Sequence, residues 1–227
     1  MKAASKGNRR VRHASTVVPA DGAAVRPPPA TKRGVRTRAS LIEAARAIFE
    51  RDGYLDSRLT DIAAEANCST GSFYTYFDSK EEILAAVLEV AKEDMMHPTM
   101  GQVDVCDDPR ALIEAGNRFY FEAYERNAKL MGLLHQVASI DPQFAEVRRR
   151  RSTQFLERNA RSIARLQAQR LADPDLDPQL TSNALSAMVS QLGFYTYVLG
   201  EPTSLDDLVE ITTRIWCNAL KLAPRPT

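Results

Sequence analysis

The chain has 227 residues, of which 44% are hydrophobic and 26% are charged, as is ordinary for a globular protein that buries a sizeable core. No run of residues approaches the roughly 18 to 20 apolar positions that a membrane-spanning helix needs, and no apolar segment follows the basic N-terminal residues as it would in a secretory signal. We therefore expect a cytoplasmic protein with no membrane partner.

The cysteine and histidine patterns do not indicate a reactive centre. The three cysteines (Cys68, Cys106 and Cys217) are odd in number and far apart, which argues against a disulfide framework or a paired metal motif. The three histidines have no partner at the spacing of metal ligands, and no nucleophile with a neighbouring base is visible. We expect no metal, no cofactor and no enzymatic activity.

The net charge of +1 conceals a segregation of charge along the chain. Residues 1–38 contain ten Lys or Arg and one acidic residue, which leaves 20 basic and 28 acidic residues in the remainder. Residues 1–35 are rich in Ala, Pro and Arg and show no sustained apolar period, so we predict a disordered basic arm. Such an arm either pairs with phosphates or is a passive solvated tail, and both interpretations stay open.

From Thr37 onward the pattern predicts helices. Residues 37–54 carry one apolar stripe, and Gly53 is the predicted stop of this helix. A short second helix is predicted to start at Ser57 as its N-cap and to end at Asn67, which tolerates a left-handed turn. Ser69 is then the predicted N-cap of a third helix.

The rest of the chain repeats one helix-start signal. An Asp-Pro pair occurs at residues 108–109, 141–142 and 177–178, where Asp caps the first turn and Pro loses nothing by lacking an N–H. The predicted helices are approximately 80–97, 109–126, 128–140, 142–171, 178–199 and 204–222. Because no segment alternates as a strand does, we predict an all-α fold of about nine helices.

The third helix, within STGSFYTYF (residues 69–77), has two different faces. At about 100° per residue, its two phenylalanines share one side, which we predict to be core (Phe73 and Phe77). The opposite side is a low polar ridge flanked by tyrosines (Gly71, Ser72 and Thr75, with Tyr74 and Tyr76). A short helix, a tight turn and a second helix with a small polar face form the helix-turn-helix arrangement, whose second helix enters a DNA major groove.

The run from Arg38 to Leu84 resembles the DNA-binding domain of the TetR family of bacterial transcriptional regulators. The motifs DIAAEA, GSFYTYF and SKEEIL stand at the family's spacing. Three positions depart from the usual pattern, with Asn67 in place of the turn glycine, Cys68 in place of Val and Thr70 where many members have Lys or Arg. The resemblance implies a DNA-binding domain at residues 36–81 and a ligand-binding and dimerisation domain at residues 82–227.

The resemblance also implies roles for particular residues. Ser72 and Thr75 are expected to read bases, and Tyr74 is expected to contact a base or a phosphate. Tyr76 and Lys80 are expected to contact phosphates, although Lys80 also fits a solvated residue of the first helical turn. The predicted DNA-binding set comprises Arg38, Ser57, Thr70, Gly71, Ser72, Tyr74, Thr75, Tyr76 and Lys80. The expected partner is a palindromic DNA operator bound by a homodimer.

The last two predicted helices carry broad apolar faces. In the family such a pair meets its symmetry mate in a four-helix bundle, although the same periodicity fits the domain's own core. The predicted dimer interface comprises Leu185, Met188, Leu192, Tyr195, Leu199, Leu208, Ile211, Ile215 and Trp216.

Four consecutive arginines, residues 148–151, lie in the helix that begins at Pro142. By angle Arg151 falls on the apolar stripe, so we expect it to pair with a carboxylate, and we hypothesise that Arg151 or Arg148 meets an anionic inducer such as a fatty-acid or acyl-CoA-like molecule. The predicted ligand-binding residues, each of which also fits a core role, are Phe121, Tyr124, Leu134, His135, Arg148, Arg151, Phe155, Gln191 and Tyr195.

The predicted function is therefore a ligand-responsive transcriptional repressor. A small hydrophobic or amphipathic effector is expected to favour a conformer in which the helix after Lys80 has swung and changed the spacing of two DNA-reading heads. Activation in place of repression stays open. An all-α enzyme and a protein-interaction adaptor without specific DNA binding are the alternatives from other classes.

Overall fold

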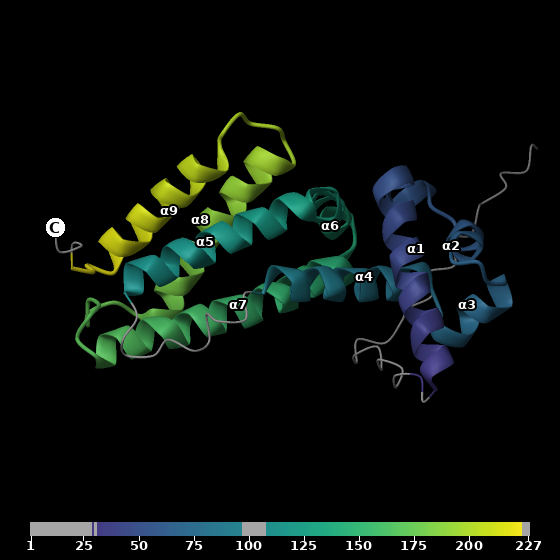
Figure 1. Cartoon of the computed structure of the whole chain (residues 1–227), viewed down its shortest axis with the longest axis horizontal. Helices are drawn as coiled ribbons and strands as arrows, with labels where there is room; N and C mark the ends of the chain where they lie inside the picture. Colours follow the sequence, from purple (N-terminus) through teal and green to yellow (C-terminus); the bar gives the residue numbers. More distant parts are fainter. Residues whose placement is uncertain (1–28, 30, 97–107, 224–227) are drawn as a thin grey trace, which may run out of the picture.

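A computed structural model describes residues 29, 31–96 and 108–223, and in these residues the regular secondary structure is helical throughout (Figure 1), as predicted. The elements are α1 (Lys32–Asp56), α2 (Leu59–Glu65), α3 (Thr70–Tyr76), α4 (Lys80–Met95), α5 (Pro109–Arg126), α6 (Ala128–Ile140), α7 (Pro142–Ala168), α8 (Pro178–Tyr197) and α9 (Leu205–Ala219). Helices α1 to α3 gather at one end of Figure 1, α5 and α7 to α9 pack together at the other, and α4 runs between them. No helix in the described ranges is long and apolar enough to cross a membrane.

Helix α1 begins earlier than the sequence pattern predicts. Thr31 caps it, because its hydroxyl accepts a hydrogen bond from the Gly34 amide at 3.1 Å, and the helix therefore includes residues that we assigned to the basic arm. Most of that arm lies outside the described residues. Gly53 breaks the helix as predicted, with φ at 77°, a backbone conformation that favours glycine, although helical geometry resumes to Asp56.

The predicted caps are confirmed with one exception. The side chains of Asp108, Asp141 and Asp177 each accept a backbone N–H of the first turn of α5, α7 and α8. Ser57 does not cap α2, and that prediction is wrong. Arg58 occupies the N-cap position without a side-chain hydrogen bond, whereas the Ser57 hydroxyl donates to the Tyr54 carbonyl at 2.8 Å.

The core of helices α1 to α4 confirms the predicted anchor of α3. Phe73 and Phe77 are fully buried, and their ring centroids lie 5.8 Å apart. The same hydrophobic cluster continues into the larger half of the molecule, because Leu130 from α6 and Phe144 from α7 belong to it. The reading unit, which we name after its predicted role and define as α1 to α3, is therefore not separated from the remaining helices by a polar boundary.

A second hydrophobic cluster joins α5, α7, α8 and α9, and it corrects part of the predicted dimer interface. Leu185, Leu208 and Trp216 are buried inside this cluster, so they belong to the chain's own core. The sequence pattern failed here because helical periodicity marks buried faces without saying which surface covers them.

The two faces of α3 should differ in their effect on stability. Replacing Phe73 by Ala should lower the free energy of unfolding by about 3–5 kcal/mol, because it leaves a cavity in a fully buried site. The half-exposed neighbour provides the control, since Tyr74→Ala should cost about 1 kcal/mol or less. Chemical denaturation followed by circular dichroism measures both values, and equal losses would contradict the division of α3 into two faces.

Candidate nucleic-acid interface and ligand cavity

The turn before α3 presents that helix in a fixed orientation. Asn67 has a φ of 52°, so it adopts the left-handed conformation expected of it. The Ser69 hydroxyl then caps α3 by accepting the Ser72 amide at 3.1 Å, and the two serine hydroxyls lie 3.0 Å apart. The hydroxyl of Ser72 is thus engaged at the start of the helix, at the edge of the exposed side.

We call the exposed side of α3 the reading face and define it by Gly71, Tyr74 and Thr75. A Cβ atom at Gly71 would meet only the Ser69 hydroxyl, at 3.8 Å, so this surface is open. The Tyr74 ring is 49% exposed and meets the Phe73 ring edge-on at 5.5 Å. Thr75 is exposed, Thr70 is exposed one turn earlier, and Tyr76 is half-buried against the core. The reading face therefore has a low centre beside a single projecting ring.

Two residues of the predicted DNA-binding set are engaged inside the protein. The Lys80 ammonium donates to the carbonyl oxygens of Tyr54 (2.7 Å), Ser57 (3.0 Å) and Leu55 (3.3 Å), and burial lowers its pKa. Ser57 is buried as well, and its hydroxyl donates a hydrogen bond to the Tyr54 carbonyl. Lys80 thus closes the C-terminal end of α1, a role that the sequence motif did not reveal. The Arg38 guanidinium lies 5.0 Å from the centroid of the Phe77 ring.

Tyr54 is one of the residues through which the reading unit contacts the other helices. Its hydroxyl donates to Glu81 at 2.8 Å, and burial together with that carboxylate raises the pKa of its phenol. Its ring meets the edge of Phe144, at the start of α7, at 5.4 Å, and the Lys80 ammonium lies 4.6 Å from its centroid. We call this set of contacts the Tyr54 junction; it ties the end of α1 to the beginnings of α4 and α7.

A cavity of about 380 Å³ lies among helices α4 to α9. Six of the nine predicted ligand-binding residues line it (Tyr124, Leu134, His135, Arg148, Phe155 and Gln191). Phe121 and Tyr195 do not: Phe121 is fully buried in the second hydrophobic cluster, and Tyr195 is 39% exposed at the surface. The side chain of Arg151 lies outside the described residues.

Several polar residues that line the cavity were not among those predicted from the sequence. Asn117 donates to Thr213 at 3.1 Å, and Asn159 donates to Ser186 at 3.0 Å, so both amides are held in place. Arg158 also lines the cavity, and burial lowers the pKa of its guanidinium. In the sequence these residues stand as polar positions on otherwise apolar helical stripes. Polar residues are also common on solvated faces, so that pattern alone does not identify a cavity lining. No cluster of His, Cys, Asp or Glu that could hold a metal ion occurs in the described part of the chain.

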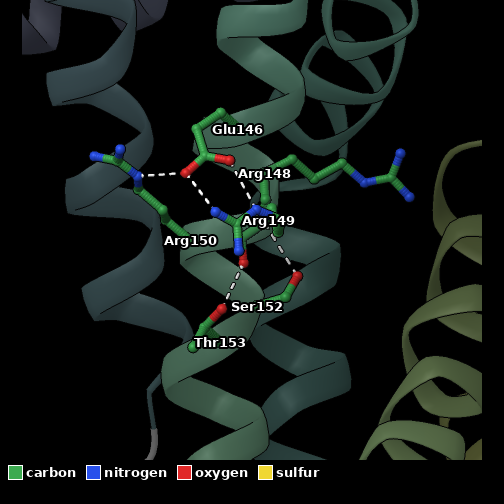
Figure 2. A network of polar contacts seen from close by, with 6 residues as sticks. All are labelled: Glu146, Arg148, Arg149, Arg150, Ser152 and Thr153. Carbon is green, nitrogen blue, oxygen red and sulfur yellow. Dashed lines mark hydrogen bonds and ion pairs between the residues drawn. The ribbon is translucent and has the colours of Figure 1, made fainter. Parts of the chain in front are cut away.

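The described side chains of the four-arginine run, those of Arg148, Arg149 and Arg150, lie in two environments (Figure 2). Arg149 and Arg150 both contact Glu146 at 2.7 Å, and their hydrogen bonds lower the pKa of this carboxyl to about 2. The Arg148 side chain extends away from that group in Figure 2, and it lines the cavity. Three neighbouring arginines therefore have different surroundings, because consecutive helical positions point in different directions.

An apolar surface remains on α8 and α9. Ile211 and Ile215, one turn apart on α9, are 43% and 36% exposed. Leu199 and Tyr195, also predicted interface residues, are exposed as well, whereas Met188 and Leu192 are partly buried against the second hydrophobic cluster. We call the four exposed residues the α8–α9 face.

Comparisons with known proteins agree with the helix-turn-helix assignment. The model of the bacterial regulatory proteins of the tetR family matches residues 41–87. The chain is 26% identical over 129 residues to the HTH-type transcriptional regulator TtgR of Pseudomonas putida, a match that covers 53% of this chain and 60% of TtgR. It is 41% identical over 59 residues to the HTH-type transcriptional repressor SCO4008 of Streptomyces coelicolor, covering 26% of this chain and 31% of that protein. The chain thus spans less than two thirds of these relatives.

The fold is similar to that of solved structures over most of the chain. The structure of GusR from Salmonella enterica superposes with a TM-score of 0.70 at 16% identity, and the match covers 85% of this chain and 98% of GusR. At this identity the likeness concerns the arrangement of helices alone.

The environment of Lys80 leads to a stability test that separates two roles. Lys80→Met should lower the free energy of unfolding by about 1–3 kcal/mol, since it removes a charged donor from three carbonyl oxygens. The matched change at an exposed lysine, Lys129→Met, should stay within about 0.5 kcal/mol of the parent protein. Thermal and urea unfolding provide the measurement. A Lys80→Met protein with unchanged stability and weakened DNA binding would instead support a phosphate contact.

Proposed function

Because the chain belongs to the TetR family of bacterial regulatory proteins, we propose that it is a DNA-binding transcriptional repressor. It acts in the cytoplasm as a homodimer on a palindromic operator. A small hydrophobic or amphipathic molecule that occupies the cavity releases it from DNA. One combined observation carries this proposal. Helix α3 is anchored by buried residues and has an exposed reading face, and the same chain holds a cavity lined by helices that contact the reading unit.

The reading face suits close approach to a major groove. Gly71 leaves the helix surface low, so base edges can come near the backbone, while the Thr75 methyl can meet a thymine methyl. The exposed Tyr74 hydroxyl can reach a base or a phosphate beside it. Phe73 and Phe77 hold the helix from behind, which keeps this face from rotating away.

Dimerisation supplies the second reading head that a palindrome requires. The α8–α9 face presents exposed apolar residues from two adjacent helices, and burial against a symmetry mate would remove this area from water. Two copies joined there would present two α3 helices to successive major grooves if they stand about 34–36 Å apart, or a multiple of that distance.

The cavity communicates with the reading unit through helices that belong to both. Helix α6 contributes Leu134 and His135 to the cavity, and α7 runs from Arg148 in the cavity back to Phe144 at the Tyr54 junction. A ligand that moves α6 and α7 therefore also displaces the contact of Phe144 with Tyr54, and with it the start of α4. Only a ligand with different affinities for the two arrangements shifts their populations.

A further set of polar contacts joins the same parts. The Arg46 guanidinium of α1 donates to the Arg126 carbonyl at 3.2 Å, and Asn127 donates to Asp94 of α4 at 2.8 Å. The end of α5 thus holds both α1 and α4. These contacts must change together if α4 swings, which makes a cooperative transition between two arrangements more favourable than a gradual one.

Operator recognition should depend on the reading face. The double variant Tyr74→Ala with Thr75→Ala should lose about 1–3 kcal/mol for each base contact removed. Fluorescence anisotropy with a palindrome selected from random DNA by the protein measures this loss. The control is Gln136→Ala with Ser139→Ala, two neutral exposed residues of α6. If the Tyr74 and Thr75 variant kept the parent protein's preference for operator over scrambled DNA, α3 would not be the reader.

The oligomeric state should depend on the α8–α9 face. Ile211→Glu with Ile215→Glu places two charges in the proposed interface and should convert the dimer to a monomer, as measured by sedimentation velocity. A matched control, Val90→Glu with Leu171→Glu, adds the same charges at exposed apolar residues elsewhere and should leave a dimer. A dimer that persists unchanged in the Ile211 and Ile215 variant would place the interface on another surface.

A further inference from the structure

We propose that the cavity takes an organic acid with an aromatic body, and that the carboxylate of this ligand pairs with Arg148. The inference deepens the proposed function by naming the chemical class of the effector. It rests on that function only for the regulatory consequence, because occupation of the cavity is measurable without DNA.

The polar lining of the cavity favours a ligand that accepts hydrogen bonds and carries negative charge. Arg148 and Arg158 contribute two guanidinium groups, and none of the described residues that line the cavity is Asp or Glu. The indole N–H of Trp216 also belongs to a lining residue, is buried, and has no hydrogen-bond acceptor among the described residues. A carboxylate supplies acceptors of the strongest kind for such donors.

Among the described side chains of the run, Arg148 is the one whose charge is left for a ligand. Arg149 and Arg150 share the carboxylate of Glu146, as Figure 2 shows, and the Arg148 side chain points away from them. Within the described ranges no carboxylate lies within ion-pair distance of the Arg148 guanidinium, although it lines the cavity. The cluster at Glu146 therefore neutralises its neighbours and leaves Arg148 as a cation at the cavity.

The position of Arg148 indicates where the carboxylate lies. Helices α6 and α7 are joined at Asp141, and His135 and Arg148 stand six and seven residues to either side of it. Arg148 lies four residues, or about one helical turn, after Phe144, whose ring contacts Tyr54 at the Tyr54 junction. Arg158 is ten residues further along α7, or about 15 Å, so Arg148 is the arginine nearer to the Tyr54 junction. The charged group thus sits at the end of the cavity nearest the Tyr54 junction.

Aromatic rings continue the cavity wall beyond Arg148. The His135 and Phe194 rings stack with their centroids 4.4 Å apart, and both line the cavity. On α7, Phe155 lies seven residues after Arg148 and hence on the same side of the helix, and the Tyr120 ring meets it edge-on at 6.0 Å. Aromatic rings from α5, α6, α7 and α8 therefore line the cavity, which favours a flat, conjugated ligand body over a flexible alkyl chain.

The single tryptophan of the chain, Trp216, lines the cavity and reports its occupation. The full-length protein is titrated with cinnamate and 2-naphthoate, and with the neutral cinnamamide and 2-naphthamide of nearly the same shape. Trp216 fluorescence and isothermal calorimetry give the dissociation constants. We expect at least one carboxylate to bind about tenfold more tightly than its amide, because a charge-assisted hydrogen bond distinguishes them.

Neighbouring arginines provide matched variants for this experiment. Arg148→Gln should abolish the preference for carboxylate over amide while leaving amide binding unchanged, and Arg149→Gln, with the same loss of charge on the same helix, should retain the preference. Circular dichroism confirms that both variants fold. Failure of both carboxylates to bind, equal binding of acid and amide, or a preference lost in Arg158→Gln but kept in Arg148→Gln would overturn the assignment. Decanoate binding as tightly as 2-naphthoate would overturn the aromatic body.

These binding experiments distinguish a failure of the cavity assignment from a failure of the proposed function. Carboxylate binding that depends on Arg148 but leaves operator affinity unchanged supports the cavity assignment and counts against ligand-controlled repression. Release of operator by a neutral amide, with no preference for the acid, supports the repressor and overturns the assignment to Arg148.

Discussion

The contacts of Tyr54 fix the position of the reading unit relative to α4 and α7. Its carbonyl accepts the Lys80 ammonium, its hydroxyl binds Glu81, and its ring packs against Phe144. These bonds join a helix of the reading unit, the connecting helix and a cavity helix at one residue. Phe73 and Phe77 of α3 belong to the same hydrophobic cluster as the buried residues of α1, so the orientation of the reading face depends on how α1 is held at this junction.

The continuous core explains how a cavity can influence a distant surface. Packed interiors deform little, so a displacement of α6 or α7 is passed on rather than absorbed. Leu130 and Phe144 carry the hydrophobic cluster of the reading unit into those two helices. A molecule bound in the cavity would touch α6 and α7 as well as α5 and α8. The position of the cavity beside α6 and α7, more than its volume, is what would let a bound molecule act on the reading unit.

Sequence patterns predicted the elements of the fold well and the partners of individual side chains poorly. Asp-Pro pairs marked three helix starts because their signal is local, and the two phenylalanines of α3 were recognised as core because they share one helical side. Lys80 and Ser57 were predicted to contact DNA, whereas the structure shows each of them donating to the Tyr54 carbonyl. For Lys80 this carbonyl is 26 residues earlier, at the end of α1, and no local pattern reveals such a contact. Leu208 and Trp216 were assigned to an interface, since periodicity cannot identify the covering surface. Arg158 was missed because an arginine on a long basic helix resembles a solvated one.

The central claim is that the cavity and the reading face are thermodynamically coupled. The most direct measurement is the affinity of the cavity for an aromatic carboxylate, followed by Trp216 fluorescence, with and without saturating operator DNA. Coupling is reciprocal, so operator should weaken carboxylate binding by the same factor by which the carboxylate weakens operator binding. Identical carboxylate affinity for the free and the operator-bound protein would contradict the account.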